Sequence, residues 1–252
     1  MISVITVCHN AERTIRDCIY SVLSQSFCNW ELIIIDGAST DSTLEIINLF
    51  EEPRIQLFSA PDNGIFDAMN KGLSRARGEL VGFLNADDFF ENRDCLSWLN
   101  RYAKSFPSVG LFVGVTKIVS EDFRYGSKIN RRDCKRIYSI SNNFRKLAAI
   151  GVVPAHPSAY FRRINFPDLR FETSYRQAGD LLFMMTIILN NKSEICFIPD
   201  LKVVMREGGI SNSGLSSRIR AQTEVNLIFR KLGLNPLVSM LRYIYKLGQF
   251  FS

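Results

Sequence analysis

The chain has 252 residues, of which 46% are hydrophobic and 22% charged, as in folded globular proteins and unlike disordered ones. Its net charge of +6 comes without the signature of a nucleic-acid-binding module, so nucleic acid is not an expected partner. The longest apolar run, residues 181–189 with one threonine inside it, is much shorter than the roughly 20 residues of a membrane-spanning helix.

The first hundred residues alternate between strand-like and helix-like segments. Strands are expected at residues 2–7, 32–35, 54–58 and 80–84. Apolar residues between them recur at helical spacing: Ile15, Ile19, Val22 and Leu23, then Leu44, Ile47 and Leu49, then Ile65, Met69, Leu73 and Ala76. Asp41 or Ser39 could cap the second helix. This alternation predicts a parallel sheet with right-handed crossovers, a nucleotide-binding α/β layer over residues 1–105.

Met1 is followed directly by the first of these strands. The start of the chain has no basic segment, apolar signal helix or cleavage site, which predicts a cytoplasmic location. The six cysteines include no Cys-x-x-Cys pair, so free thiols are expected rather than a zinc site or a disulfide framework.

Residues 106–213 are less regular. Strands are expected at residues 111–119 and 158–162, with one or two more within residues 195–205, and short helices at residues 144–150 and 181–189. Residues 122–136 are polar and basic, and predict a loop or a hairpin. Because no Pro-, Gly- or Ser-rich linker separates the halves, residues 1–213 are interpreted as a single α/β domain with a central, mostly parallel sheet flanked by helices.

Residues 214–252 form a basic, amphipathic tail that is expected to be helical. They contain six Lys or Arg residues against one acid, Glu224, and so carry +5 of the total charge of +6. Aromatic and aliphatic residues are interleaved with these charges, a pattern typical of a helix at an anionic membrane surface. A helix packed on the domain with a solvated basic face explains the pattern equally well.

Acidic residues follow the ends of two predicted strands. Asp36 comes directly after three isoleucines, and Asp87 and Asp88 come shortly after the strand at residues 80–84. Ligands of open α/β sheets bind at the carboxyl ends of the strands, where these acids would share a crevice. Two adjacent aspartates repel each other unless a cation lies beside them, and their hard oxygen atoms favour Mg²⁺ or Mn²⁺. The alternative is that Asp36 or one of the paired aspartates merely caps a helix.

The sequence has neither G-x-G-x-x-G after its first strand nor G-x-x-x-x-G-K-[ST]. Dehydrogenases and P-loop NTPases are therefore not expected. A protein that binds a diphosphate without such a loop depends on a metal, and the acidic strand end would supply its ligands.

Five sequence blocks together resemble the inverting glycosyltransferases of family 2. They are SVITVCHN at residues 3–10, SVLSQ at 21–25, ELIIIDGASTD at 31–41, PDNGIFDAMNKG at 61–72 and FLNADD at 83–88. Two later blocks, HPS at residues 156–158 and AGDL at 178–181, resemble the acceptor-side blocks of the family more weakly. The resemblance implies the Rossmann-like A-type glycosyltransferase fold in one domain, with a donor half at residues 1–105 and an acceptor half at 106–213.

The resemblance also implies roles for individual positions. Residues from Val7 through His9 to Asn10 would cradle the base of the donor, and Asp36 would bind its uracil or ribose. The remaining residues expected to line the donor pocket are Asp62, Asp67, Lys71, Asn85, Ala86 and His156. Asn85 departs from the first aspartate of the family's Asp-x-Asp motif, although an amide can still hydrogen-bond a ribose. Asp87, with Asp88 beside it, would bind the Mn²⁺ or Mg²⁺ that bridges the diphosphate.

Asp180 matches the catalytic base of the family. Inverting transfer needs one base to deprotonate the acceptor hydroxyl, and Asp180 opens an apolar helix where burial could raise its pKa. Without the resemblance, an N-cap role for this aspartate is the simpler reading. Residues 207–211, with two consecutive glycines, could form a turn that closes over the donor phosphates or merely a tight connection.

The expected function is metal-dependent transfer of one sugar from a nucleotide-sugar, with UDP favoured, in bacterial surface polysaccharide synthesis, including lipopolysaccharide. The acceptor implied is a saccharide on a lipid carrier, which the tail would meet at the inner face of the membrane. A sugar-phosphate nucleotidylyltransferase and an inactive nucleotide-sugar-binding module remain as alternatives. The segment Cys8 to Arg13 lacks the Gly-rich, Arg-containing loop of the former, and Asn85 keeps the latter open.

Overall fold

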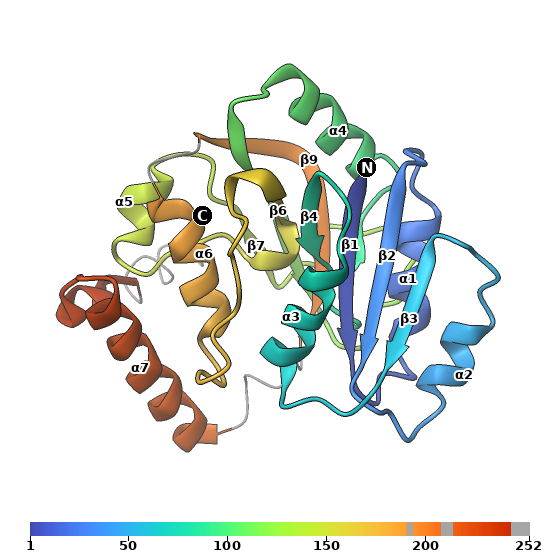
Figure 1. Cartoon of the computed structure of the whole chain (residues 1–252), viewed down its shortest axis with the longest axis horizontal. Helices are drawn as coiled ribbons and strands as arrows, with labels where there is room; N and C mark the ends of the chain where they lie inside the picture. Colours follow the sequence, from blue (N-terminus) through green and yellow to red (C-terminus); the bar gives the residue numbers. More distant parts are fainter. Residues whose placement is uncertain (191–193, 208–213, 243–252) are drawn as a thin grey trace.

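The computed structural model describes residues 1–190, 194–207 and 214–242. A mixed nine-stranded sheet forms its centre, with helices on both faces (Figure 1). The strand order is β3-β2-β1-β4-β8-β6-β9-β5, with β7 paired to β6. The predicted α/β fold, a central sheet flanked by helices, is confirmed. The sheet is mixed and not mostly parallel as predicted, because four of the eight strand pairings of the described residues are antiparallel.

The first half consists of a parallel sheet with helical crossovers, as the alternating pattern predicts. Its elements are β1 (Ile2–Cys8), α1 (Ile15–Leu23), β2 (Trp30–Asp36), α2 (Thr43–Asn48), β3 (Ile55–Ser59), α3 (Ile65–Arg75) and β4 (Leu80–Phe83). The pairings β3–β2, β2–β1 and β1–β4 are all parallel. Two expected core residues are misplaced: Leu49 lies just beyond the end of α2 and is 66% exposed, and Ile65, the first residue of α3, is 41% exposed.

The second half is mainly antiparallel. Its elements are β5 (Phe89–Phe90), α4 (Cys95–Ser105), β6 (Val109–Val119), β7 (Arg136–Tyr138), α5 (Phe144–Ala148), η1 (His156–Ser158), β8 (Ala159–Arg162), η2 (Arg163–Asn165), α6 (Gly179–Leu189) and β9 (Glu194–Arg206). Strand β8 runs antiparallel to both β4 and β6, and among the strands that the structure describes in this half only the β6–β9 pair is parallel. Loops and short helices, rather than full crossover helices, connect β6 to β8, and such connections suit antiparallel neighbours.

The strands of the first half are buried on both sides, which explains their continuous apolar runs. In β1, Ile2 and Val4 face the cluster that includes α1, α2 and α4, whereas Ile5 and Val7 face the cluster that includes α3, α5 and α6. Side chains alternate between the two faces with a period of two, so each apolar residue of β1 enters one of two cores. Each fully buried isoleucine contributes about 2 kcal/mol of hydrophobic stabilisation.

The tail begins with α7 (Gly214–Lys231) and continues to the 3₁₀ helix η4 (Pro236–Met240). The inner face of α7, with Val225, Ile228 and Phe229, packs in one hydrophobic cluster with residues of α6. Its Ile219 and Leu227 are exposed. Within the described residues, no helix is both long and apolar enough to cross a membrane. The predicted packing of the tail on the domain is thus found for α7, while its membrane contact stays a prediction.

Candidate functional site

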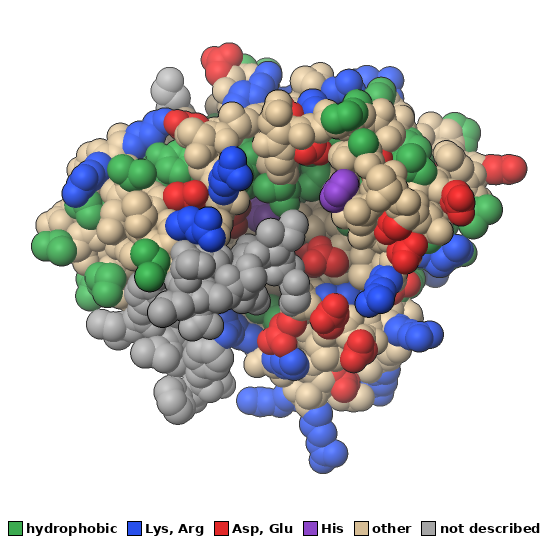
Figure 2. Space-filling view, turned by 90° about the horizontal axis from the view of Figure 1, so that it is seen from below, with side chains coloured by type: hydrophobic (Ala, Val, Ile, Leu, Met, Phe, Trp, Pro, Cys, Tyr) green, Lys and Arg blue, Asp and Glu red, His purple; other side chains and the backbone are tan. Residues whose placement is uncertain are grey.

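The candidate site lies where the parallel strands end. The carboxyl ends of β1, β2 and β3 point to the bottom of Figure 1, and the same face seen from below is hollowed at its centre, with acidic side chains and histidine around the hollow (Figure 2). The last residues of β1 and β2, Cys8 and Asp36, are direct partners in the parallel ladder. The expected meeting of the strand ends at one edge is therefore found.

Asp36 is completely buried, and both of its carboxylate oxygens are hydrogen-bonded within the protein. It accepts hydrogen bonds from the backbone N–H of Ser39 at 3.0 Å, from the hydroxyl of Ser59 at 2.7 Å, from the Ser39 hydroxyl and from the thiol of Cys8. Burial acts to raise the pKa of Asp36, but these hydrogen bonds outweigh it and hold the pKa below its ordinary value. Asp36 is an ionised anchor that shapes the turn after β2, and its direct contact with a donor stays a prediction.

The turns after β1 and β2 are joined to each other. His9 Nδ1 lies 2.9 Å from the carbonyl oxygen of Gly37, and the backbone N–H of Asn10 donates to the Ser39 hydroxyl at 2.8 Å. In return, the side-chain oxygen of Asn10 accepts from the backbone N–H of Thr40 at 2.8 Å. Asn10 itself has a positive φ of 51°, a conformation that asparagine tolerates better than most residues. The predicted base-binding residues His9 and Asn10 are thus exposed, on a turn that hydrogen bonds to the turn after β2 hold in place.

The turn before α3 closes the same edge. Gly37 lies close to Asp62, since a Cβ on the glycine would be 2.5 Å from Asp62 Oδ2. Asp67 forms an ion pair with Lys71 at 3.0 Å, and Lys71 also donates to the carbonyl of Pro61 at 3.1 Å. The backbone N–H of residue 63 and then Lys71 hold the pKa of Asp67 below its usual value. Asp62, but not the Asp67–Lys71 pair, is therefore directly against the β2 turn.

The acidic turn after β4 contains Asn85, Ala86, Asp87 and Asp88. Asp88 is only 1% exposed, and its Oδ2 accepts a hydrogen bond from the Asn85 side chain at 2.9 Å. Its Oδ1 is buried and has no hydrogen-bond partner among the described residues. Ala86 is buried, and Asp87 is half-buried. Neither aspartate caps the following helix, because Asp94 is the residue at the start of α4. The capping alternative is thereby wrong for this pair.

Arg206, at the end of β9, hydrogen-bonds to the backbone of the acidic turn. Its guanidinium donates to the backbone carbonyl of Asp87 at 2.8 Å and to that of Phe123 at 2.8 Å, and forms an ion pair with Asp17 of α1. Sequence reasoning missed this residue. The available signal was a single arginine at the end of the apolar strand expected at residues 195–205.

The positive charge of Arg206 does not neutralise the paired aspartates. Burial raises the pKa of Asp87, and Arg206 and His156 offset only part of this rise. Burial, followed by repulsion from Asp87, raises the pKa of Asp88 well above its usual value, against the hydrogen bond from Asn85 and the charge of Arg206. Negative charge is therefore under-compensated at this turn, as expected for carboxylates that receive a cation.

These residues fit a divalent cation that is shared with a ligand. The described residues contain no cluster of three or more His, Cys, Asp or Glu side chains that could hold a metal alone. Magnesium is commonly bound by only one or two carboxylates, with water and substrate phosphates as its other ligands. Asp87, which is more exposed than Asp88, is the better placed of the two to contact such an ion, with the unpartnered Oδ1 of Asp88 behind it.

His156 connects the acidic turn to the predicted base. Its Nε2 lies 3.3 Å from Asn85 Oδ1, and its Nδ1 lies 3.8 Å from Asp180 Oδ2. The imidazole is edge-on to the ring of Phe83, the last residue of β4, with 6.3 Å between the ring centres. Asn85 and His156 are 71 positions apart in the sequence. Through His156, the turn after β4 is thus linked to Asp180 of α6.

Asp180 lies in the first turn of α6, and its side chain is 45% exposed. The residue at the N-cap position is Ala178, so the expectation that Asp180 would itself be the N-cap is wrong. Its Oδ1 accepts from the backbone N–H of Leu181 at 2.8 Å, and its Oδ2 is the atom that faces His156. An oxygen that is directed at the site and partly open to solvent suits a proton acceptor.

Two other expectations concern the surroundings of the site. Residues 208–211 of the predicted glycine turn lie outside the described residues, and Glu207 at its start forms an ion pair with Lys135. All six cysteines, which lie within the described residues, are free, as predicted. Burial raises the pKa of the Cys18 thiol to about 12, so that thiol is protonated and unreactive.

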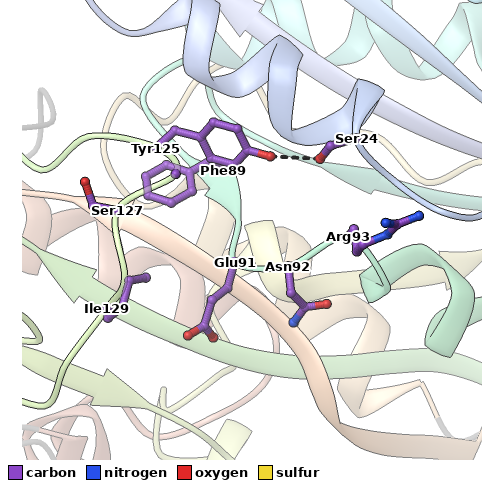
Figure 3. Close-up of a pocket in the computed structure, with 9 residues that line it drawn as sticks. Ser24, Phe89, Glu91, Asn92, Arg93, Tyr125, Ser127 and Ile129 are labelled. Carbon is purple, nitrogen blue, oxygen red and sulfur yellow. Dashed lines mark hydrogen bonds between the residues drawn. The ribbon is translucent and has the colours of Figure 1, made fainter.

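A cavity of about 330 Å³ lies apart from these residues. It is lined by residues of the turn after β5, of the loop after β6 and of the end of α1, and the hydroxyls of Ser24 and Tyr125 are 2.8 Å apart across it (Figure 3). It includes none of the residues expected from the sequence to bind donor or metal. The candidate site is therefore an open hollow at the strand ends and not this cavity.

The sequence model of the family described as "Glycosyl transferase family 2" matches residues 3–166. A glycosyltransferase of Haemophilus influenzae is 43% identical over 103 residues, which are 40% of this chain and 41% of that protein. The putative teichuronic acid biosynthesis glycosyltransferase TuaG of Bacillus subtilis is 44% identical over 91 residues, 35% of this chain and 36% of TuaG. A PGL/p-HBAD biosynthesis glycosyltransferase of Mycobacterium tuberculosis is 33% identical over 129 residues, which are 50% of each chain. These matches span at most half of the relatives' own length.

Two solved structures share the fold. S. aureus TarS 1–349 in complex with UDP-GlcNAc has a TM-score of 0.69 at 23% identity, covering 90% of this chain and 65% of that one. The mannosyltransferase PcManGT from Pyrobaculum calidifontis, in complex with GDP-Man and Mn²⁺, has a TM-score of 0.64 at 21% identity, covering 92% of this chain and 63% of that one. At these identities the likeness supports the fold and not the substrate.

Proposed function

The chain belongs to glycosyl transferase family 2, and we propose that it transfers one sugar, with inversion, from a UDP-sugar to a saccharide acceptor. The observation that carries the proposal is the bridge through His156, which lies 3.3 Å from Asn85 of the acidic turn and 3.8 Å from Asp180. A base and a set of diphosphate-binding carboxylates must flank one reacting carbon. The bridge supports this arrangement with residues from both halves of the chain.

In this proposal Asp180 is the base. It accepts the proton of the acceptor hydroxyl while the hydroxyl oxygen forms a bond to the anomeric carbon of the sugar. The bond between that carbon and the diphosphate oxygen breaks, and its electron pair leaves with UDP. His156 keeps the Asp180 carboxylate turned toward the site through their 3.8 Å contact.

The donor is bound by the edge formed by the turns after β1 and β2 and before α3. His9 and Asn10 are exposed on this edge and would contact the base, while Asp36 and Asp62 accept hydrogen bonds within the turns that surround it. Asp87, with Asp88 behind it, would hold Mg²⁺ or Mn²⁺. When bound, that ion stabilises the negative charge that grows on the departing diphosphate.

The acceptor is proposed to be a growing surface saccharide on a lipid carrier, reached from the cytoplasmic face of the membrane. Two features support this. The relatives include proteins named for teichuronic acid and PGL/p-HBAD biosynthesis. In addition, η4 and the residue after it expose Leu237, Met240 and Leu241, beside a basic α7, as a surface for anionic lipid.

A donor panel tests the proposal. The full chain would be incubated with UDP-, GDP- and dTDP-sugars, Mn²⁺ and saccharide acceptors, with nucleotide release and product mass as readouts. We expect release of UDP together with an acceptor that is one sugar heavier, and loss of both when EDTA is added. Release of pyrophosphate from a nucleoside triphosphate would instead indicate a nucleotidylyltransferase. Donor binding without any turnover would indicate a binding module.

A further inference from the structure

Helix α7 contacts the segment that leads into Asp180. Its Glu224, the sole acid of residues 214–252, accepts hydrogen bonds from three consecutive backbone N–H groups. Glu224 Oε1 lies 2.9 Å from the nitrogen of Arg176, and Oε2 lies 2.9 Å from that of Gln177 and 2.8 Å from that of Ala178. Successive N–H groups that converge in this way form a concave site for an anion, and here the anion belongs to another helix of the same chain.

The bonded residues are the last three before α6. Ala178 occupies the N-cap position, and its methyl side chain cannot accept a hydrogen bond from the helix start. Glu224 thus supplies from α7 the negative charge that a helix amino terminus favours. Asp180 follows two residues after Ala178, so the direction in which its carboxylate points depends on how this turn is held.

A second contact fixes the same turn from the other side. A Cβ on Gly179 would lie 2.5 Å from the ring of Phe66 in α3, so the turn is pressed against α3 at this point. The hydrophobic cluster between α6 and α7 includes Ala178 and Val225. The turn is therefore held between α3 of the donor half and α7 of the tail.

We propose that Glu224 is a positioning residue for Asp180, so that α7 is a working part of the acceptor half. This inference rests on the proposed function, in which Asp180 is the base. If the three hydrogen bonds are lost, the turn at residues 176–178 can shift, and with it the carboxylate that must meet the acceptor hydroxyl. Donor binding, which uses the ends of β1, β2 and β4, does not depend on this turn.

The test compares Glu224→Gln with Glu224→Asp and Lys231→Met in the full chain. The amide keeps the shape of glutamate but places an NH₂ group against backbone N–H donors, whereas aspartate keeps the charge on a shorter side chain. Lys231→Met is the matched control, because it removes another contact of α7, the ion pair with Glu172, without touching residues 176–178. Calorimetric UDP titration with Mn²⁺ counts the folded donor sites, and kcat is expressed per counted site.

We expect Glu224→Gln to lower kcat per donor site about tenfold, as misplacement of a reacting group does, with KM for the donor and the UDP stoichiometry unchanged. Glu224→Asp should recover part of kcat, and Lys231→Met should leave it unchanged. If total activity and UDP stoichiometry fall by the same factor, so that kcat per donor site is unchanged, Glu224 has a folding role and the inference is overturned. Unchanged kcat in Glu224→Gln would overturn it alone, while a wild-type chain without transfer on any donor would overturn the proposed function as well.

Discussion

The donor and acceptor sides of the site are held together in different ways. On the donor side, Asp36 is fixed by Cys8, Ser39 and Ser59, all within the first 60 residues and on one parallel unit. On the acceptor side, the turn before Asp180 is bonded to Glu224, 46 to 48 positions further along. The donor side is thus a local, pre-arranged surface, while the acceptor side requires distant segments to assemble. We expect changes on the two sides to have separable effects on binding and on turnover.

Asp180→Asn gives the sharpest separation of the two sides. Asparagine keeps the shape of the side chain but cannot take up the acceptor proton, and general-base catalysis is worth about 10²–10⁴-fold. We expect kcat for transfer to fall about 10³-fold, while the Kd for UDP with Mn²⁺ stays unchanged. Initial-rate assays of transfer measure kcat, and calorimetric titration measures the Kd for UDP. A large loss of UDP affinity would contradict the assignment of Asp180 to the acceptor side.

Arg206→Gln tests the connection between the sides. Arg206 is buried and joins β9 to Asp17, 189 positions earlier, and to the backbone of Asp87. Its removal leaves the half-buried carboxylate of Asp17 without its cation and two backbone carbonyls without their donor, so we expect a loss of about 3 kcal/mol in the free energy of unfolding. Urea unfolding measures it, with Lys135→Gln as control, because that lysine forms an ion pair with Glu207 in which both side chains are exposed. Equal effects of the two substitutions would argue against a central role for Arg206.

The outer surface of the tail should matter for membranes and not for chemistry. Changing Leu237, Met240 and Leu241 together to serine removes exposed apolar surface without altering the packed face of α7. We expect binding to anionic vesicles to weaken about 100-fold or more, since each of the three apolar side chains, when buried in lipid, contributes on the order of 1–2 kcal/mol. Vesicle sedimentation measures this effect, and kcat with a water-soluble acceptor should be unchanged. Wild-type vesicle binding by the variant would defeat the membrane proposal.

Asp88→Asn tests how much the ionisation of this buried carboxyl group, on the donor side, costs in stability. Burial and the neighbouring Asp87 raise the pKa of Asp88, so the folded chain binds a proton there more tightly than the unfolded chain does. Stability is therefore lost as pH rises through the raised pKa, and asparagine avoids this loss. In the presence of EDTA, we expect the variant to be more stable by about 1 kcal/mol near pH 8, with the gain shrinking as the pH falls toward the ordinary pKa of an aspartate, about 4.

Urea unfolding across this pH range measures the effect, and Asp67→Asn serves as the control. The pKa of Asp67 is lowered by the backbone N–H of residue 63 and by Lys71, so its contribution to stability is lost as pH falls instead. A gain for Asp88→Asn that is independent of pH would show that charge is not the cause.

The first half of the fold could be predicted from the sequence because its signals are local. The runs at residues 2–7 and 32–35 are apolar on both faces of the sheet, and Met69 and Leu73 of the predicted stripe fall on the buried face of α3. The antiparallel half gave weaker signals. Strands β5 and β8 have two and four residues, and β8 lies between β4 and β6, partners far from it along the chain.

The candidate site shows the same limit. The paired acids and Asp36 follow strand ends, so topology alone places them at one edge. The burial of Asp36 and Asp88 could not be predicted, because it depends on which neighbours cover them. Arg206 and Glu224 appeared in the sequence only as a strand-terminal charge and as the single acid in a basic tail. Their partners, the carbonyl of Asp87 and the N–H groups of residues 176–178, are backbone atoms that no pattern of side chains reveals.

The position of β8 beside β4 has a consequence for synthesis on the ribosome. When the first hundred residues have emerged, β1 to β4 can pair, yet one edge of β4 lacks the neighbour that residues 159–162 later provide. An open strand edge invites pairing with other chains, so the nascent protein passes through an aggregation-prone interval until β8 arrives. The turn at Asp87 lacks the hydrogen bond from the guanidinium of Arg206 until that residue, too, has been synthesised. A truncated donor half would therefore be a poor substitute for the whole chain in nucleotide-binding studies.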